Sequence, residues 1–331
     1  MQAATKCSFD QYIKTIGTFQ SMKDDLDEDY YSDLEEIVNN AMKQVSDRTG
    51  KYLHNLWKLD KKPDEDTLLK IIDDVPSSLS YEDEDGWLPI VSAAEHEDSL
   101  QYVPLLANGG VKHNVGGDDA RGGLQGYDNV LSDLGSPIMD CSEIDVPLYL
   151  NVMKKLRESK LLLREDIRDY DLLYHACGPQ TLMIFEYLID WCPEGLKTHQ
   201  YNGLPLIHAI INYSSIEEYS IFLETALRYH SNDLGLLFLR DREGQTACER
   251  AFKTYGKDKT MSAIGELIPF DDPKVPILHH VAKHAPQYMK DFGSRYPSAT
   301  YFRDSQGRTL HQATLENGYK TFIDDPMFSL K

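Results

Sequence analysis

The stretch Pro193-Glu194-Gly195-Leu196, followed by Asn202-Gly203-Leu204-Pro205-Leu206-Ile207-His208-Ala209, decides the fold class, because its pattern occurs three times in the chain. In each copy a glycine lies ten residues after a proline, and an alanine follows the glycine within seven residues on an apolar run. The three sets are Pro76, Gly86 and Ala93; Pro193, Gly203 and Ala209; and Pro297, Gly307 and Ala313. Such recurrence indicates a repeat architecture rather than a catalytic motif.

Each part of this pattern predicts a local structure. Proline cannot continue a helix, so it ends the apolar helix before it, and the glycine step supplies a turn that tolerates positive φ. A new helix is expected to start at Pro89 and at Pro205, where the missing amide has no partner within the helix anyway. The alanine is expected on the inward face, where a small side chain admits the neighbouring helix pair. The predicted unit is helix, turn, helix, turn.

Weaker copies fill the intervals between these three sets. Ala176 lies 33 residues before Ala209, and the run that contains Gly244 ends at Ala251, 42 residues after Ala209. Val281 follows 30 residues later, and the last inward alanine follows after another 32. Steps of 30 to 33 residues therefore define the period, and the longer step requires an insertion.

At this period the chain resembles the ankyrin repeat proteins, whose unit of about 33 residues opens its first helix with Gly-x-Thr-Pro-Leu-His-x-Ala. The matching stretches are 86–94, 202–209 and 307–313, and the resemblance covers about residues 65–331. The Thr-Pro pair is intact in no copy, and the signature histidine survives only as His279. The resemblance implies an all-α solenoid of helix-turn-helix repeats, in which His279 would brace the turn between repeats.

The second helix of each predicted unit should be amphipathic and cover the first. Tetratricopeptide or HEAT-like repeats are the competing interpretation, and they lack a glycine turn at this phase. The candidate second helices lie at residues 68–72, 100–106, 182–191, 216–229 and 261–268.

The first 62 residues differ in character, and we expect an acidic helical cap there on an array that occupies 63–331. Solenoids need such a cap because an end repeat otherwise exposes its apolar face. Residues 24–36 carry eight acidic side chains. An apolar stripe suited to cover the first repeat is formed by Leu34, Ile37, Val38, Met42 and Val45.

The same acidic stretch partly fits a calcium-binding loop. Its acidic side chains occupy positions one, three, five, nine and twelve of the template, but the sharp turn at position six falls on Tyr30 instead of glycine. A calcium-modulated binder is therefore kept as an alternative. The candidate ligands are Asp25, Asp27, Asp29, Asp33 and Glu36.

A glycine-rich run interrupts the repeats. Seven glycines between Gly109 and Gly126 predict a flexible insertion at about residues 109–143, with no helix through the glycines. The segment 146–156 is expected to be the helix of a degraded copy. A phosphate-binding loop would need a preceding strand and a closing Lys-Ser/Thr, and the sequence offers neither.

Composition limits the function. A net charge of −20 disfavours nucleic acid and anionic membranes as partners and favours basic protein surfaces. Five scattered cysteines, without a Cys-x-x-Cys spacing, and no apolar segment of about 20 residues predict a cytosolic or nuclear protein. His280 and His284 share a helical face that could hold a metal ion, but a structural role is favoured. Catalytic and dinucleotide motifs are absent from the sequence, so neither enzyme activity nor a cofactor nor a metal site is expected.

The resemblance implies a protein-interaction scaffold or adaptor that grips its partner with the repeat turns and a concave face. The alternative is a substrate-recruiting or regulatory region of a larger enzyme or ligase, and the ending at 324–331, inside an expected helix, favours further chain or a degraded cap. Trp87 is either the anchor of the interface or packed on a neighbouring turn. The expected contact residues are Glu84, Asp85, Trp87, Tyr201, Asn202, Arg242, Glu243, Ser305, Gln306 and Arg308.

Overall fold

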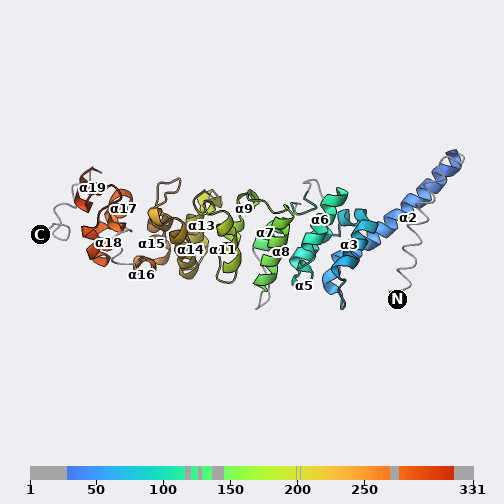
Figure 1. Cartoon of the computed structure of the whole chain (residues 1–331), viewed down its shortest axis with the longest axis horizontal. Helices are drawn as coiled ribbons and strands as arrows, with labels where there is room; N and C mark the ends of the chain where they lie inside the picture. The colour runs from blue at the N-terminus through green and yellow to red at the C-terminus, as the bar shows by residue number, and fades with distance from the viewer. Residues whose placement is uncertain are drawn as a thin grey trace. The chain divides into compact units, whose positions relative to one another are not determined.

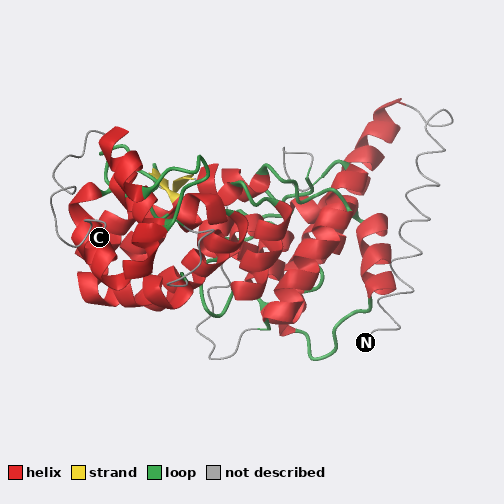
Figure 2. Ribbon diagram, turned by 60° about the vertical axis from the view of Figure 1, so that its left-hand side comes forward, coloured by secondary structure: helices red, strands yellow, loops and turns green. Residues whose placement is uncertain are grey.

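The computed structural model describes residues 28–115, 121–125, 129–135, 145–198, 200–201, 203–268 and 276–316. These residues are mostly helical, which confirms the all-α prediction, and their one short sheet is a two-stranded antiparallel hairpin (Figure 2). The chain divides into two compact units, residues 1–163 and 164–331. Figure 1 labels most of the helices along the chain.

The first unit consists of helices that follow one another closely. Helix α3 begins where Asp64 caps it, because the Asp64 carboxylate accepts the Thr67 backbone N–H at 2.7 Å. It ends before Pro76, as the sequence predicts. The elements are α2 (Glu28–His54), η2 (Leu56–Lys58), α3 (Glu65–Asp74), η3 (Pro76–Ser80), α4 (Pro89–Glu95), α5 (Glu97–Leu100), α6 (Val103–His113), α7 (Val130–Gly135) and α8 (Val146–Glu158).

Helix α2 packs against η3 and α4, but not through the predicted stripe. Ile37 is 62% exposed and Met42 is 43% exposed, and no residue of the stripe is buried. Burial begins only at Gly50 and continues through Leu53 and His54. The expectation that the stripe covers the first repeat is therefore wrong; the last turns of α2 make that contact instead.

The calcium-loop hypothesis is also wrong over its described part. A calcium loop of this type separates two helices, whereas Glu28–His54 is one uninterrupted helix that contains Asp33 and Glu36. The structure does not describe residues 1–27, which include Asp25 and Asp27, or the side chains of residues 28–31. Asp33 and Glu36 therefore lie on a continuous helix rather than in a loop.

The expectation that no helix passes through the glycine-rich run is wrong at its start. Gly109 and Gly110 are buried inside helix α6. A β carbon at Gly109 would lie 2.6 Å from Cγ2 of Ile72 in α3, and one at Gly110 would lie 2.6 Å from Cα of Gly122. These glycines permit close packing rather than flexibility. Helix α7 also lies within the predicted insertion, whose residues 116–120, 126–128 and 136–144 fall outside the described part.

The second unit is also built of short helices joined by turns. Helices α11 and α14 coincide with the predicted ranges 182–191 and 216–229. The elements are α9 (Asp166–Asp169), α10 (Leu172–His175), α11 (Leu182–Trp191), α12 (Gly195–Thr198), β1 (Gln200–Tyr201), β2 (Leu204–Pro205), α13 (Leu206–Tyr213), α14 (Ile216–Tyr229), η4 (Ser231–Leu236), α15 (Ala247–Tyr255), α16 (Lys257–Leu267), α17 (Ile277–His284), η5 (Pro286–Tyr288), α18 (Met289–Arg295), η6 (Pro297–Tyr301) and α19 (Leu310–Glu316).

The start of helix α14 shows why this segment is helical. The Ser215 side chain accepts the Glu218 backbone N–H, and the Glu218 carboxylate accepts the Ser215 backbone N–H. This reciprocal capping box satisfies two amides that the helix leaves unpaired. Thr246 and Glu249 form the same arrangement at the start of α15.

Small and apolar side chains fill the interior of both units. The inward alanines of the repeat pattern are all buried: Ala93, Ala176, Ala209, Ala251 and Ala313. Cys177, Cys192 and Cys248 are buried free thiols, and burial raises the pKa of each. They therefore pack as small apolar side chains, while Cys7 and Cys141 lie outside the described residues.

Candidate functional site

Three turns of the sequence Asp-x-x-Gly share one geometry. In each, the aspartate Oδ1 accepts the backbone N–H groups two and four residues later, at 2.9 to 3.0 Å. The glycine has φ of 82°, 79° or 72°, a conformation that other residues adopt with strain. We call these segments the Asp–Gly turns: Asp83–Gly86, Asp241–Gly244 and Asp304–Gly307.

Two of these turns carry a further lock. In each, the arginine before the aspartate donates a hydrogen bond from Nη1 to the carbonyl oxygen of the turn glycine. Arg240 donates to Gly244, and Arg303 donates to Gly307. The same arginines form isolated bridges to Thr246 and Thr309 across the turn. The turns are thus rigid hairpins rather than open loops, which positions the residues at their tips.

A buried histidine from a preceding helix holds each turn. Nε2 of His54 lies 3.1 Å from the Tyr81 carbonyl oxygen, and Nε2 of His208 lies 3.0 Å from that of Leu239. Nε2 of His279 lies 3.1 Å from the carbonyl oxygen of Arg308, the residue directly after the third turn. Because a carbonyl only accepts, each Nε2 carries the proton. The sequence resemblance gave His279 this bracing role and did not assign it to His54 or His208.

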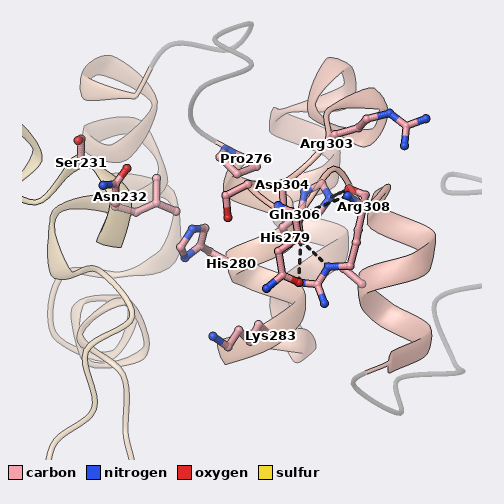
Figure 3. A pocket seen from close by; sticks show the side chains of 13 residues that line it. Ser231, Asn232, Pro276, His279, His280, Lys283, Arg303, Asp304, Gln306 and Arg308 are labelled. Atoms are coloured by element: carbon pink, nitrogen blue, oxygen red, sulfur yellow. Dashed lines mark hydrogen bonds and ion pairs between the residues drawn. The ribbon is translucent and has the colours of Figure 1, made fainter.

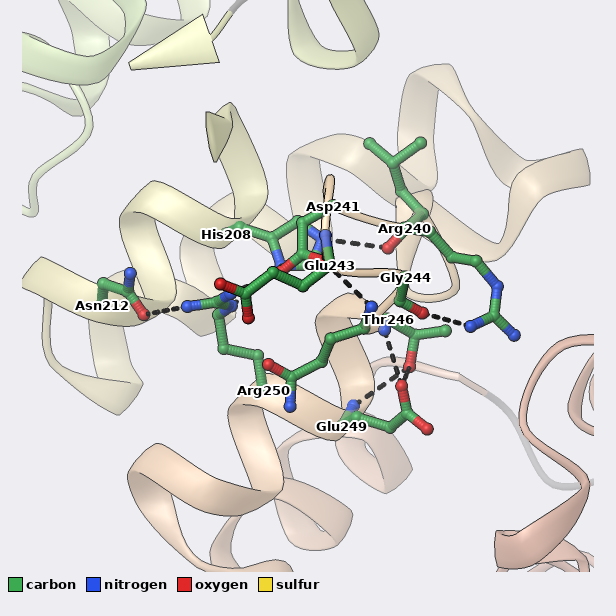
Figure 4. A network of polar contacts seen from close by, with 11 residues as sticks. His208, Asn212, Arg240, Asp241, Glu243, Gly244, Thr246, Glu249 and Arg250 are labelled. Atoms are coloured by element: carbon green, nitrogen blue, oxygen red, sulfur yellow. Dashed lines mark hydrogen bonds and ion pairs between the residues drawn. The ribbon is translucent and has the colours of Figure 1, made fainter. Parts of the chain in front are cut away.

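The second turn is embedded in a polar network (Figure 4). Arg250 donates from Nε to Nδ1 of His208 at 3.1 Å, from Nη1 to Asn212 at 3.1 Å, and from Nη2 to the Asp241 carboxylate. Burial alone would raise the pKa of Asp241, but the hydrogen bonds from Arg250 and the Gln245 amide hold it below its usual range. Burial lowers the pKa of His208, which keeps its ring neutral.

The third turn lacks the equivalent partner. Nδ1 of His279 is buried, and no hydrogen-bond partner for it exists among the described residues. Ala313 lies nine residues after Asp304, at the position that Arg250 holds after Asp241. A methyl group cannot donate a hydrogen bond, so the third histidine is braced through one ring nitrogen only.

Six of the ten predicted contact residues lie within the Asp–Gly turns, Trp87 and Arg308 directly follow the turn glycine, and Tyr201 lies on β1. Most are exposed, whereas Trp87, Tyr201 and Arg308 are partly buried. Glu84, Asp85 and Trp87 belong to the first unit, and the other described contact residues belong to the second unit. Asn202 lies outside the described residues. The exposed contact residues are Glu84, Asp85, Arg242, Glu243, Ser305 and Gln306.

An aromatic cluster adjoins Tyr201 in the second unit. The rings of Tyr174 and Tyr201 stack with centroids 3.6 Å apart and planes 10° apart. Tyr213 meets both rings edge-on, at 6.3 and 6.1 Å, and His175 meets both at 5.6 and 6.1 Å. Tyr213 is 59% exposed, so the cluster reaches the surface. We call these four residues the tyrosine cluster.

The cluster includes Tyr201 of the β1–β2 hairpin. Gln200 pairs with Pro205, and Tyr201 pairs with Leu204, so the hairpin turns at Gly203, whose φ is 75°. A β carbon at Gly203 would lie 3.3 Å from Nη1 of Arg242, which brings the second Asp–Gly turn to the hairpin. The sequence prediction named Tyr201 and Arg242 but missed the other two tyrosines of the cluster, because they lie on helices α10 and α13.

His280 and His284 of α17 stack on an aromatic ring instead of pointing toward a shared metal position. The rings of His280 and His284 both stack on Phe238, at 6.4 and 6.2 Å with planes within 18°. Burial lowers the pKa of His280 to about 4 and also lowers that of His284. In the described part of the chain no three His, Cys, Asp or Glu side chains converge on a point where a metal ion could bind.

Comparisons with known proteins give no relative. No protein-family model, no curated protein and no solved structure matches this chain. In the ranges that the structure describes, none of the helices combines the length and the apolar character needed to cross a membrane.

Proposed function

We propose that the chain is a divergent ankyrin-like repeat array that acts as a protein-interaction scaffold. Three features support the repeat interpretation: Asp–Gly turns of one geometry, a histidine brace behind each turn, and buried alanines at the repeat period. Rigid turns that project charged and aromatic side chains are suited to hold a partner, because little entropy is lost when they bind.

The observation that carries this proposal is the tyrosine cluster beside Arg242. Tyrosine and arginine are the residue types that most often dominate protein-protein binding energy. A tyrosine offers a large contact area with few rotatable bonds and a hydroxyl that can hydrogen-bond at the interface. Tyr213 is already held by two neighbouring rings, so its exposed face is preorganised for a partner.

The overall negative charge points to a partner with a basic face. With a formal net charge of −20, the chain attracts positively charged proteins over a distance of about 10 Å at ordinary salt. In a larger enzyme or ligase, the same surface would recruit the substrate protein. Both versions of the proposal place the primary contact at the turns and at the tyrosine cluster.

The proposal is tested by affinity capture from a lysate with Tyr213→Ala and with a matched control, Tyr301→Ala. Tyr301 is 75% exposed, and its ring contacts no other aromatic ring of the described residues. We expect the wild-type chain and Tyr301→Ala to retain one specific partner, and Tyr213→Ala to lose at least about tenfold in affinity. Equal retention by all three chains would overturn the assignment of the contact to the tyrosine cluster.

A further inference from the structure

A groove in the second unit differs in charge from the rest of the chain. Figure 3 shows the side chains that line it. It has a volume of about 640 Å³ and lies among η4, α17, the third Asp–Gly turn and α19. This volume falls within the range of about 300–1,000 Å³ typical of ligand sites. Its polar walls include Asn232, His280, Lys283, Arg303, Gln306 and Arg308.

The charges that line the groove are mostly positive. Lys283 and Arg303 are exposed, and neither forms an ion pair with an acidic side chain of the described residues. Asp304 is the one acidic residue of the lining, and its carboxylate is held at 2.7 Å by Arg308. Asp233, next to the lining residue Asn232, is paired with Lys197 at 2.9 Å. The acidic groups near the groove are thus already partnered.

The region around the groove departs from the composition of the chain. The described residues 276–316 carry five Lys and Arg side chains against three Asp and Glu, whereas the whole chain has 34 against 54. His279 and His280 add no charge at neutral pH, because burial lowers the pKa of both. A positive groove on a strongly negative chain attracts a local negative charge and offers little to a basic ligand.

The neutral part of the lining indicates the kind of anion. Ser231, Asn232, Ser305 and Gln306 provide hydroxyl and amide groups that can both donate and accept hydrogen bonds. Such groups match the alternating N–H and C=O of a peptide backbone, while the flanking cations match acidic side chains. A nucleic acid would instead need a wider array of cations to neutralise successive phosphates.

We propose that this groove binds an acidic peptide segment of a partner protein. The segment lies along the third Asp–Gly turn, with glutamate or aspartate side chains against Lys283 and Arg303. The inference rests on the proposed scaffold function and adds a second contact to it. The chain as a whole favours a basic protein surface, whereas the groove favours an acidic segment. The tyrosine cluster and the groove share no residue, so either contact can exist without the other.

The test measures binding of fluorescein-labelled decaglutamate to the full chain by fluorescence anisotropy at low salt, with decaglutamine as the neutral control. We expect decaglutamate to bind and decaglutamine not to bind, and we expect affinity to fall as salt rises. Lys283→Gln should weaken binding about threefold, and Lys283→Gln with Arg303→Gln should weaken it about tenfold.

Lys290→Gln is the matched control. Lys290 is an exposed lysine of α18 that does not line the groove, so its substitution removes the same charge from the same unit at a different place. It should leave decaglutamate affinity within about twofold of wild type. Circular dichroism of each variant checks that the unit remains folded.

Three results would overturn the proposal: no binding of decaglutamate, an equal loss with Lys290→Gln and Lys283→Gln, or equal binding of decaglutamate and of a ten-nucleotide thymidine strand. The proposed scaffold function fails separately, through the tyrosine variants. If Tyr213→Ala loses its partner while decaglutamate does not bind, only the groove assignment is wrong.

Discussion

Nδ1 of His54 lies 2.8 Å from Oγ of Ser92, and this contact completes the brace behind the first Asp–Gly turn. Ser92 lies nine residues after Asp83, as Arg250 lies nine residues after Asp241. Both side chains donate to the free ring nitrogen of the bracing histidine. The residue nine positions after the turn aspartate therefore determines whether the histidine is fully hydrogen-bonded.

Ala313→Ser should stabilise the second unit. The serine hydroxyl would donate to the buried Nδ1 of His279, which has no described partner, and such a bond contributes about 1 kcal/mol. Urea unfolding followed by circular dichroism measures the change. The gain should vanish in a His279→Leu background; a gain that persists there, or a loss of stability in the wild-type background, would show that the hydroxyl does not reach the ring.

Ser92→Ala should have the opposite effect in the first unit. It leaves Nδ1 of the buried His54 ring without a donor, which costs about 1–3 kcal/mol in the free energy of unfolding. Ser32→Ala, at an exposed position of α2, serves as the control and should change the urea midpoint little. Equal midpoints for the two variants would contradict the importance of the brace.

Stability should fall as the pH drops below about 6.5, in part through His280. Burial and the neighbouring His284 lower its folded pKa to about 4, whereas the unfolded ring titrates near 6.5. Between these values the unfolded state binds more protons, so its population rises as pH falls. The stabilisation is fully present above pH 6.5 and is lost progressively toward pH 4.

The measurement for this pH prediction is the urea midpoint at pH 7, 6 and 5 for wild type and for His280→Gln. The variant should lose less stability across this range, by up to about 1 kcal/mol for each pH unit. Parallel curves for the two proteins would mean that the His280 pKa is not lowered by folding. Comparison with the variant removes the contribution of carboxylates, which titrate in both proteins.

Local sequence signals predicted the helices well but could not predict the aromatic contacts. The bounds of α11 and α14 follow from apolar periodicity and from the flanking Pro193 and Ser215, which act within a few residues. The stacking of Tyr174 on Tyr201 depends instead on the hairpin that folds back at Gly203. Such a contact between separate elements leaves no mark in local periodicity.

Two failures of the sequence prediction have a common cause. A glycine in a sequence suggests flexibility, yet Gly109 lies in a helix at a position where Ile72 leaves no room for a side chain. An apolar stripe predicts a buried helix face, yet Ile37 is largely exposed because α2 extends past the helices that it contacts. In both cases the neighbour, rather than the residue itself, decides the environment.

Gly109→Ala distinguishes the packed helix from a flexible loop. A β carbon would overlap Cγ2 of Ile72 at 2.6 Å, so the substitution should destabilise the first unit by about 1–3 kcal/mol. In a flexible loop the same change would be neutral or would stabilise by restricting the unfolded chain. Thermal unfolding of the variant decides between the two, and an unchanged or raised melting temperature would contradict the packing.

The most direct test of the central claim is hydrogen–deuterium exchange of the full chain with and without its captured partner. We predict that the partner protects residues 172–176, 200–213 and 240–246, which carry the tyrosine cluster and the second Asp–Gly turn, more than helices α11 and α14. Protection confined to α11 and α14, with no change at the turns, would contradict the claim that the turns and the tyrosine cluster form the binding surface.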